Sequence, residues 1–366
     1  MTNKFLSEEL REWLDVSRRE FMQRISLGAA TAAVTGSVLA KSVSADELRD
    51  HVQVADSGKK VKVGIGLNYG PFNQPWRRGC WRLVKTVLDG GGEIVAVRGE
   101  PSKDSEQQSE RQLLDRGIDV LCLGIYSQES ETAFIVDEAK KRGIKTVGFA
   151  VPVKDSPAVV EDTWGTAMVM GYQIQNVLQR QGTLVQTAED RGFYTPFDME
   201  GDLLELMTKY EPRMKVLPFM PGSTSTSDQI SKGRENALAL LQANPDPDSI
   251  QAIVSWWWPL TLGAAQALKQ MNRKGIRVFN HYFSDQFLSE MQNPDSPIEF
   301  STDTPWHIMG DKTGELALAL GRDQDVAPNV YHVPVTSITK DQAAKSLAEI
   351  QDMDKQAIAL LKQYGG

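Results

Sequence analysis

The chain has 366 residues, a formal net charge of −8 at pH 7 and a sequence pI of about 5.2. This length is enough for two ordinary domains, and the shares of hydrophobic residues (41%) and charged residues (24%) are typical of a globular protein. Because a nucleic-acid-binding surface needs clustered basic side chains, the acidic balance argues against a nucleic-acid partner.

The first 45 residues resemble a twin-arginine export signal. Arg18 and Arg19 precede a weakly apolar stretch, 25–40, and the segment ends at Ala45 in a small-x-small cleavage pattern. We therefore predict that the twin-arginine translocase exports the chain, that residues 1–45 are removed and that the mature protein is soluble and periplasmic. The alternative is a charged amphipathic helix that happens to contain two arginines. No later apolar run is long enough to span a membrane.

Cysteine and histidine are too sparse to suggest a metal or cofactor. Cys80 is expected early in a helix and Cys122 within a strand, so two buried free thiols are the favoured interpretation and a disulfide is the alternative. The four histidines stand at positions 51, 281, 307 and 332, without metal-ligand spacing. We therefore predict no metal site and no cofactor.

Strand and helix patterns alternate from residue 60 onward. The first series predicts strands at 60–66, 93–97, 120–125 and 144–149 and helices at 76–88, around 112–114 and at 131–142. The second series predicts helices at 164–181, 202–210 and 227–243 and a further helix that ends at 269–274. It predicts strands at 183–187, 214–219, 252–254 and 276–280. Such alternation is typical of parallel, doubly wound sheets.

The last part of the chain predicts crossings between two lobes. A lone strand at 298–303, a helix at 305–321 and a strand at 330–336 suit a chain that passes between the lobes more than once. We predict two doubly wound, Rossmann-like α/β lobes with parallel sheets, joined by a multi-strand hinge. The predicted first lobe is 46–161 with 305–332, the second is 162–304 with 333–340, and 341–366 form a helical tail.

Three adjacent tryptophans mark the most unusual stretch. An apolar strand ends just before Trp256, and Trp257 and Trp258 follow before a small-residue helix. Ligands of α/β sheets bind beyond the carboxyl ends of the strands. We therefore expect at least one of these rings, with Trp257 and Trp258 as the candidates, to face a ligand cleft. The alternative is that all three cap a hydrophobic core or contact a partner.

Other candidate ligand-binding residues also stand at predicted strand or helix ends. Trp76 and Trp164 open helices, with a core position as the alternative for Trp76. Arg77 lies in a first helical turn, where a cation is disfavoured, so a ligand or a carboxylate of the other lobe would hold it, unless it is simply solvent-exposed. The remaining candidates follow predicted strands, and each has a purely structural alternative: Tyr126, Tyr194 and Asp198 in the loop 191–200, His281 and Asp303.

The order of elements over residues 60–340 resembles the type I periplasmic binding proteins, the ribose-binding-like group. Gln74-Pro75-Trp76 resembles the family's Asn-Pro-aromatic turn, whose ring stacks on the ligand, and 252–268 resembles a segment whose turn carries polar ligand contacts. The resemblance implies two lobes that close on a small polar ligand, such as a sugar or polyol, for delivery to an ABC permease. It makes Gln74 a further candidate contact and implies no enzymatic activity.

Three departures from the family pattern bear on the ligand. Ala150 and Val151 stand where the family has an Asp/Arg pair, Trp257 and Trp258 replace an Asn-Asp turn, and His281 replaces a strand-end Asp. Acidic groups and arginine are what fix a pattern of sugar hydroxyls. Their replacement argues against an ordinary pentose or hexose.

A narrower resemblance, to the TorT-type periplasmic sensors of trimethylamine N-oxide, supplies an alternative function. Trp76, Trp164, 170–173, 282–286 and Asp303 followed by Trp306 carry it. It implies an aromatic cage for a methylated amine and a sensor-kinase partner. Asn73 and Pro75 depart from that family's pocket.

An exported enzyme is the third possibility, because twin-arginine export is often used for cofactor-loaded enzymes. Against it, the sequence has no distinctive Ser/His/Asp spacing, and Gly64-Ile65-Gly66 lacks the third glycine of a dinucleotide fingerprint. A transcription regulator of this fold is excluded by the absence of a helix-turn-helix before the first lobe.

Overall fold

In the computed structural model, residues 1–50 and 51–366 are separate units. The structure describes residues 58–67, 74–98, 103–124, 129–223 and 228–364. The predicted export signal and Tyr126 lie outside these residues. Among the helices that the structure describes, none combines the length and the apolar character that a membrane span requires.

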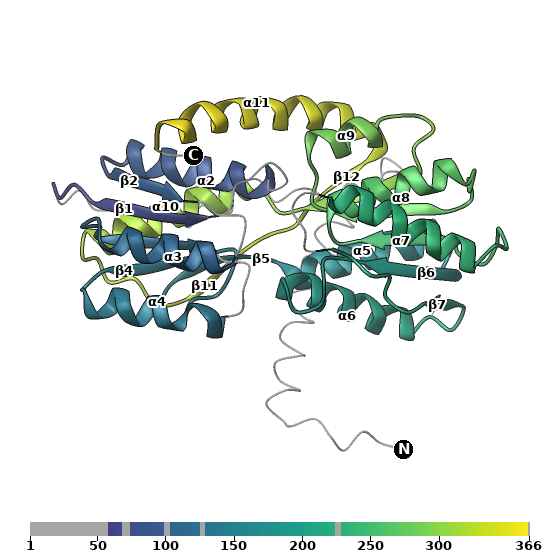
Figure 1. The fold of residues 1–366 in the computed structure, drawn as a ribbon, viewed down its shortest axis with the longest axis horizontal. Helices are drawn as coiled ribbons and strands as arrows, with labels where there is room; N and C mark the ends of the chain where they lie inside the picture. Colours follow the sequence, from purple (N-terminus) through teal and green to yellow (C-terminus); the bar gives the residue numbers. More distant parts are fainter. Residues whose placement is uncertain (1–57, 68–73, 99–102, 125–128, 224–227, 365–366) are drawn as a thin grey trace, which may run out of the picture. The chain divides into compact units, whose positions relative to one another are not determined.

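The first lobe is built on a six-stranded sheet in the order β11-β5-β4-β3-β1-β2, with every pairing parallel (Figure 1). Its strands are β1 (Lys62–Leu67), β2 (Glu93–Arg98), β3 (Val120–Gly124), β4 (Lys145–Phe149), β5 (Ala158–Glu161) and β11 (Val330–Val333). Its helices are α2 (Gln74–Asp89), α3 (Lys103–Leu114), α4 (Glu129–Lys141) and α10 (Trp306–Gly321). Helices α2 and α10 cross at Gly310, where a Cβ would lie 2.1 Å from the carbonyl oxygen of Gly79.

The second lobe has a six-stranded sheet in the order β12-β10-β9-β8-β6-β7. Its strands are β6 (Gly182–Thr187), β7 (Met214–Val216), β8 (Ala252–Ser255), β9 (Arg277–His281), β10 (Ile298–Asp303) and β12 (Thr336–Thr339), and only the β10–β12 pairing is antiparallel. Its helices are α5 (Thr163–Val177), α6 (Thr195–Lys209), α7 (Gln229–Ala243), α8 (Trp258–Gln270) and α9 (Asp285–Met291).

Among the strands that the structure describes, the chain passes from one sheet to the other three times: after β5, after β10 and between β11 and β12. Two doubly wound parallel sheets joined by several crossing segments are the fold class that the sequence predicts, which is thereby confirmed. The apolar runs of β3 and β8 are buried along their whole length, as strands covered on both faces should be.

The structure corrects several predicted elements. The expected strand 330–336 is two strands in different sheets, with Pro334, which has no N–H to donate, between them. Helix α6 begins at Thr195, so the second half of the expected loop 191–200 is helical, and Pro196 suits the first turn of that helix. Strand β5 and helix α9 are absent from the prediction.

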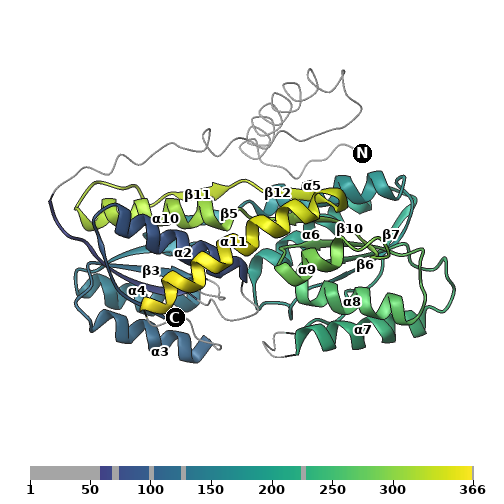
Figure 2. The ribbon, with the colours of Figure 1, turned by 90° about the horizontal axis from the view of Figure 1, so that it is seen from above.

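The tail comprises two short 3₁₀ turns, Lys340–Gln342 and Lys362–Tyr364, on either side of the long helix α11 (Ala343–Leu361). One stripe of the helix is buried, with Ile350 and Leu361 among its residues. The helix packs against α9 of the second lobe and α2 of the first, as Figures 1 and 2 show. The tail therefore bridges the two lobes.

Both cysteines are buried and unpaired, which confirms the favoured interpretation of the sequence. Burial raises the pKa of Cys122 to about 12 and raises that of Cys80 as well, with the neighbouring Cys122 contributing to the shift of Cys80. The thiols are therefore protonated at neutral pH and unreactive in the folded protein.

Candidate functional site

Four chain segments bring polar and aromatic side chains to the junction of the two lobes. Glu161 ends β5 and Asp303 ends β10, both at points where the chain crosses between lobes. Strand β9 ends in His281, and β8 leads into the three tryptophans. Because parallel strands present their carboxyl ends at one edge of a sheet, the ends of β8, β9 and β10 lie together, and Glu161 meets them from the sheet of the first lobe at a crossing. All of them are buried.

Six buried rings form what we call the aromatic cluster: Trp76, Tyr194, Phe197, Trp257, Tyr282 and Trp306. Trp76 of α2 meets the rings of Tyr194, Trp257 and Tyr282 edge-on, at centroid distances of 5.5, 6.3 and 5.8 Å. Such pairs are worth about 0.5–1.5 kcal/mol each beyond their buried area. Since Trp76 and Trp306 belong to the first lobe and the other four to the second, the lobes contact each other ring against ring.

The three consecutive tryptophans have different surroundings. Trp256 is fully buried in the second lobe and donates its indole N–H to Oε1 of Gln186 at 2.8 Å. The indole N–H of Trp257 donates to Oε1 of Gln229 at 2.9 Å, and this hydrogen bond holds the ring in the aromatic cluster. Trp258 begins α8 and packs against Trp257 at a centroid distance of 6.1 Å. Of the two predicted cleft residues, Trp257 reaches the lobe junction and Trp258 supports it.

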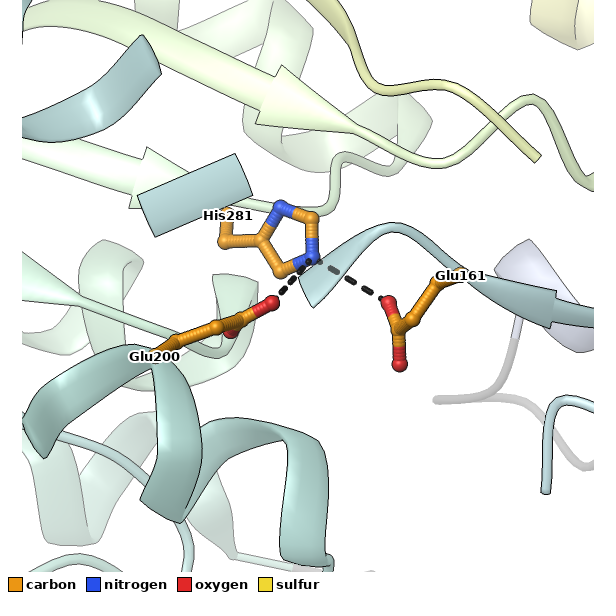
Figure 3. A group of neighbouring side chains, drawn as sticks. All are labelled: Glu161, Glu200 and His281. Atoms are coloured by element: carbon orange, nitrogen blue, oxygen red, sulfur yellow. Dashed lines mark ion pairs between the residues drawn. The ribbon is translucent and has the colours of Figure 1, made fainter. Parts of the chain in front are cut away.

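Beside the aromatic cluster lies a buried group of Glu161, Glu200 and His281, which we call the acid–histidine cluster (Figure 3). Nε2 of His281 lies 3.5 Å from Oε2 of Glu161 and 3.6 Å from Oε1 of Glu200. Burial lowers the pKa of His281, so the imidazole is neutral at pH 7. Burial, and then the charge of Glu161, raise the pKa of Glu200.

The two clusters are joined by hydrogen bonds to Glu161. The hydroxyl of Tyr194 donates to Oε1 of Glu161 at 2.5 Å, and the hydroxyl of Tyr282 donates to Oε2. Oγ1 of Thr304, on the crossing after β10, also donates to Oε2 at 3.2 Å. Burial is the main cause that raises the pKa values of both tyrosines, so both remain protonated donors.

The first turn of α2 provides polar contacts to the second lobe. The side chain of Gln74 donates to Oδ1 of Asp285 at 2.8 Å and accepts from the Asp285 backbone N–H at 3.2 Å. The buried Arg78 donates to the carbonyl oxygen of Phe283 at 3.1 Å and lies 3.7 Å from Oδ2 of Asp303. Burial raises the pKa of Asp303 to about 7, although the charge of Arg78 acts in the opposite direction.

The predicted site residues separate into two groups. The structure brings Trp76, Tyr194, Trp257, His281 and Asp303 to the junction, with Gln74 bonded across it and Trp258 packed against Trp257. Arg77, next to them on α2, lies 3.5 Å from Oδ1 of Asp354 in the tail helix, so its carboxylate partner is on the tail.

Trp164 and Asp198 are not brought into either cluster by any contact that the described residues make. The Trp164 side chain, in the first turn of α5, is 56% exposed. Asp198 accepts a hydrogen bond at 2.7 Å from the backbone N–H of Gly192 and pairs with Arg191, so it stabilises its own turn. Tyr126 lies outside the described residues.

Sequence reasoning overlooked Glu161, Glu200 and Trp306 as site residues. Glu161 ends β5, a strand that the sequence pattern does not predict, and Glu200 stands at the end of the predicted loop 191–200, in the part that is helical in the structure. Charged residues are almost never fully buried unless they are paired, so nothing in the sequence marks these two carboxylates as interior groups. Trp306 could have been found from its place at the predicted crossing after Asp303.

Comparison with known proteins identifies this architecture. A family model described as a periplasmic binding protein domain matches residues 65–323. No curated protein matches the sequence at a significant level.

Among similar solved structures, an ABC transporter solute binding protein from Agrobacterium vitis with bound allitol is 21% identical, with a TM-score of 0.69 over 80% of this chain and 99% of that one. A 5-methylthioribose transporter solute binding protein from Thermotoga lettingae is 16% identical, with a TM-score of 0.68 over 84% and 93%. The arabinose-binding component of an ABC transporter from Shewanella sp. ANA-3 is also 16% identical, with a TM-score of 0.68 over 82% and 98%. At these identities the likeness establishes the fold.

Proposed function

The chain belongs to the periplasmic binding protein family, and from this premise we propose that it is a periplasmic receptor that closes its two lobes on a sugar, a polyol or a related small polar solute. The three similar structures were determined with allitol, 5-methylthioribose and arabinofuranose bound, or belong to transporters of such solutes. We propose that this protein likewise delivers its solute to an ABC permease, and that it binds without catalysis.

The observation that carries the proposal is the ring-against-ring contact between the lobes. Aromatic rings offer flat apolar surfaces for the C–H faces of a sugar or polyol, and binding sites combine such walls with a few convergent polar groups. Here the polar groups at the junction are Glu161 and Asp303, with the tyrosine hydroxyls that bond to Glu161. The absence of the family's Asp/Arg pair at Ala150 and Val151 favours a polyol or a modified sugar over an ordinary pentose or hexose.

The contacts between the two lobes support a mechanism in which the lobes close on the solute. Gln74 and Arg78 of the first lobe bond to Asp285 and to the Phe283 backbone of the second, and these bonds require the lobes to be in contact. A ligand that touches both lobes binds the closed form more tightly than the open form and shifts the population toward closure by that difference in affinity. The permease would then recognise the closed form.

The proposal also includes an export route for the chain. The twin-arginine pattern at Arg18 and Arg19 and the cleavage pattern at Ala45 support passage through the twin-arginine translocase, with the mature protein released into the periplasm. The binding function and the export route are independent proposals, since either is possible without the other.

The decisive experiment is a thermal-shift screen of the protein from Asp46 onward against sugars, polyols and methylated amines, followed by isothermal titration calorimetry of each hit. We expect at least one polyol or sugar derivative to raise the melting temperature and to bind with a stoichiometry of one. Binding of trimethylamine N-oxide or another methylated amine, with no response to any sugar or polyol, would overturn the proposal in favour of the sensor alternative.

A further inference from the structure

We propose that Glu161, Glu200 and His281 form a binding site for one divalent transition-metal ion at the hinge. Each residue offers one ligand atom, and these atoms all lie within 4.8 Å of one another. Figure 3 shows the three side chains pointing toward a common point from three separate elements. Glu161 comes from β5 of the first lobe, while Glu200 of α6 and His281 of β9 belong to the second.

The spacing of the donor atoms fits a tetrahedral ion. Bonds of about 2.0–2.2 Å to nitrogen and carboxylate oxygen place neighbouring donors of a tetrahedral zinc ion about 3.3–3.6 Å apart. Nε2 of His281 lies 3.5 Å from the nearer Glu161 oxygen and 3.6 Å from the nearer Glu200 oxygen. Two of the three donor separations are therefore close to those of a bound ion before any side chain moves.

Buried polar atoms of the cluster that have no hydrogen-bond partner among the described residues are a second observation in favour of a bound ion. Both carboxylate oxygens of Glu200 and Nε2 of His281 are buried and have no hydrogen-bond partner within the part of the chain that the structure describes. Burying a carboxylate without a partner is costly, because the group loses its hydration and gains nothing in return. A cation between the three side chains would give a partner to Nε2 of His281 and to one oxygen of Glu200.

The surroundings of the cluster hold its donors in place. Nδ1 of His281 is hydrogen-bonded to Oγ1 of Thr302 at 2.8 Å, which leaves Nε2 to face the two carboxylates. When Nδ1–H donates in this bond, the lone pair of Nε2 points at the two carboxylates. The lone pair and the carboxylates repel each other when no cation lies between them, and all three can bind a cation that does. Glu161 is fixed by the hydroxyls of Tyr194 and Tyr282, and an ion on Oε2 would take the place of the longer hydrogen bond from Thr304. Such outer hydrogen bonds orient the ligands of most protein metal sites.

The donor set selects the kind of ion. One neutral imidazole with two carboxylates suits Zn²⁺ and its neighbours better than Mg²⁺ or Ca²⁺, which prefer oxygen alone. The three side chains leave a fourth position of a tetrahedral ion to a water molecule or a solute oxygen. Because the donors come from both lobes, the ion would tie the crossing segment after β5 to the second lobe.

The test uses the protein from Asp46 onward, without a histidine tag and stripped with EDTA. Zn²⁺ is titrated by calorimetry in the absence of solute, and Co²⁺ is added separately to obtain the visible spectrum of a tetrahedral site. We expect about one equivalent of Zn²⁺ to bind and the melting temperature to rise. Glu200→Gln, which preserves the shape of the side chain, should weaken binding at least about tenfold.

Glu189→Gln is the matched control, because Glu189 is another buried carboxylate of the second lobe but lies outside the cluster. It should bind Zn²⁺ as the wild type does. No Zn²⁺ uptake by the wild type, or equal uptake by Glu200→Gln, would overturn the metal site. Solute binding measured in EDTA separates the two proposals, since the receptor function stands if the solute binds without metal and the metal site stands if Zn²⁺ binds without solute.

Discussion

Trp76 meets Trp257 edge-on across the lobe junction, with ring centroids 6.3 Å apart and an interplanar angle of 80°. The first ring stands in the opening turn of α2 and the second immediately before α8, so each ring is carried by the start of a helix in a different lobe. A contact of this kind is lost when the lobes separate. The pair therefore links the packing of the junction to the opening and closing of the protein.

Removing the Trp257 ring should weaken solute binding. Trp257→Ala deletes one wall of the aromatic cluster and the indole that bonds to Gln229, while leaving the strand and helix on either side intact. We expect the dissociation constant for the solute found in the screen to rise by about tenfold or more, as loss of a buried aromatic anchor typically costs over 1 kcal/mol. Calorimetry on the folded variant measures this.

Trp256→Phe serves as the control for that variant. The Trp256 ring is equally buried but bonds to Gln186 inside the second lobe. It should lower the free energy of unfolding and leave the dissociation constant nearly unchanged. Full affinity in Trp257→Ala would contradict the placement of the solute against this ring.

The Arg78–Asp303 pair should be strongly coupled. At about pH 9, where the Asp303 carboxyl is ionised in the wild type, Arg78→Met leaves this buried carboxylate without its cation, and breaking a buried ion pair in this way typically costs about 3–5 kcal/mol. Adding Asp303→Asn removes the uncompensated charge, so the double variant should recover part of that loss. Urea unfolding of the wild type, both single variants and the double variant gives the coupling energy. Strict additivity of the two single effects would show that the pair does not interact.

Glu189 should make the protein less stable as the pH rises. Burial raises the pKa of Glu189 to about 8, so between its ordinary pKa of 4.5 and about 8 the folded protein keeps a proton that the unfolded chain releases. The free energy of unfolding therefore contains a term that is fully present below pH 4.5 and is lost as the pH rises to 8. Glu189→Gln keeps an acceptor for Gln229 and cannot titrate.

Between pH 4.5 and about 8, the free energy of unfolding of the wild type should fall relative to that of Glu189→Gln. The difference should change by up to about 1.4 kcal/mol for each pH unit. Urea unfolding midpoints at several pH values between 4.5 and 9 measure the difference. A constant difference between the two proteins would mean that Glu189 has an ordinary pKa in the folded state.

The tail helix should contribute to stability through its buried stripe alone. The side chain of Leu361 is 2% exposed and that of Ile358, three residues earlier, is 51% exposed. Leu361→Ala should lower the free energy of unfolding by about 2–5 kcal/mol, and Ile358→Ala should change it by no more than about 0.5 kcal/mol. Equal effects in chemical unfolding would show that the helix is not packed on the lobes as described.

The fold was predictable from the sequence because the strands of a doubly wound sheet are short apolar runs that alternate with helical patterns. Strand β5 was harder to recognise, because its four residues include Glu161, and a charged residue at a strand end looks like the start of a loop. The split of 330–336 into β11 and β12 depends on which sheet each half joins, and that is set by packing with distant strands.

The site was predictable only in part. The ends of the predicted strands indicated Trp257, His281 and Asp303. The sequence alone could not show which of the three adjacent tryptophan rings reaches the junction, because that depends on their hydrogen-bond partners. Gln186 and Gln229 decide that Trp256 points into the second lobe and Trp257 reaches the aromatic cluster, and both glutamines are distant in sequence. Glu200 lies on an amphipathic helix, where a carboxylate would ordinarily face solvent.

The late position of β11 in the chain matters for folding during synthesis. Strand β5 ends at residue 161, yet the strand that covers its outer edge begins only at residue 330. A growing chain therefore carries β5, which is buried in the folded protein, as an uncovered edge strand while the whole second sheet except β12 is made, and an apolar unpaired edge is a template for aggregation. Neither lobe can be produced as one continuous fragment, and the ribosome must release nearly the full chain before either sheet is complete.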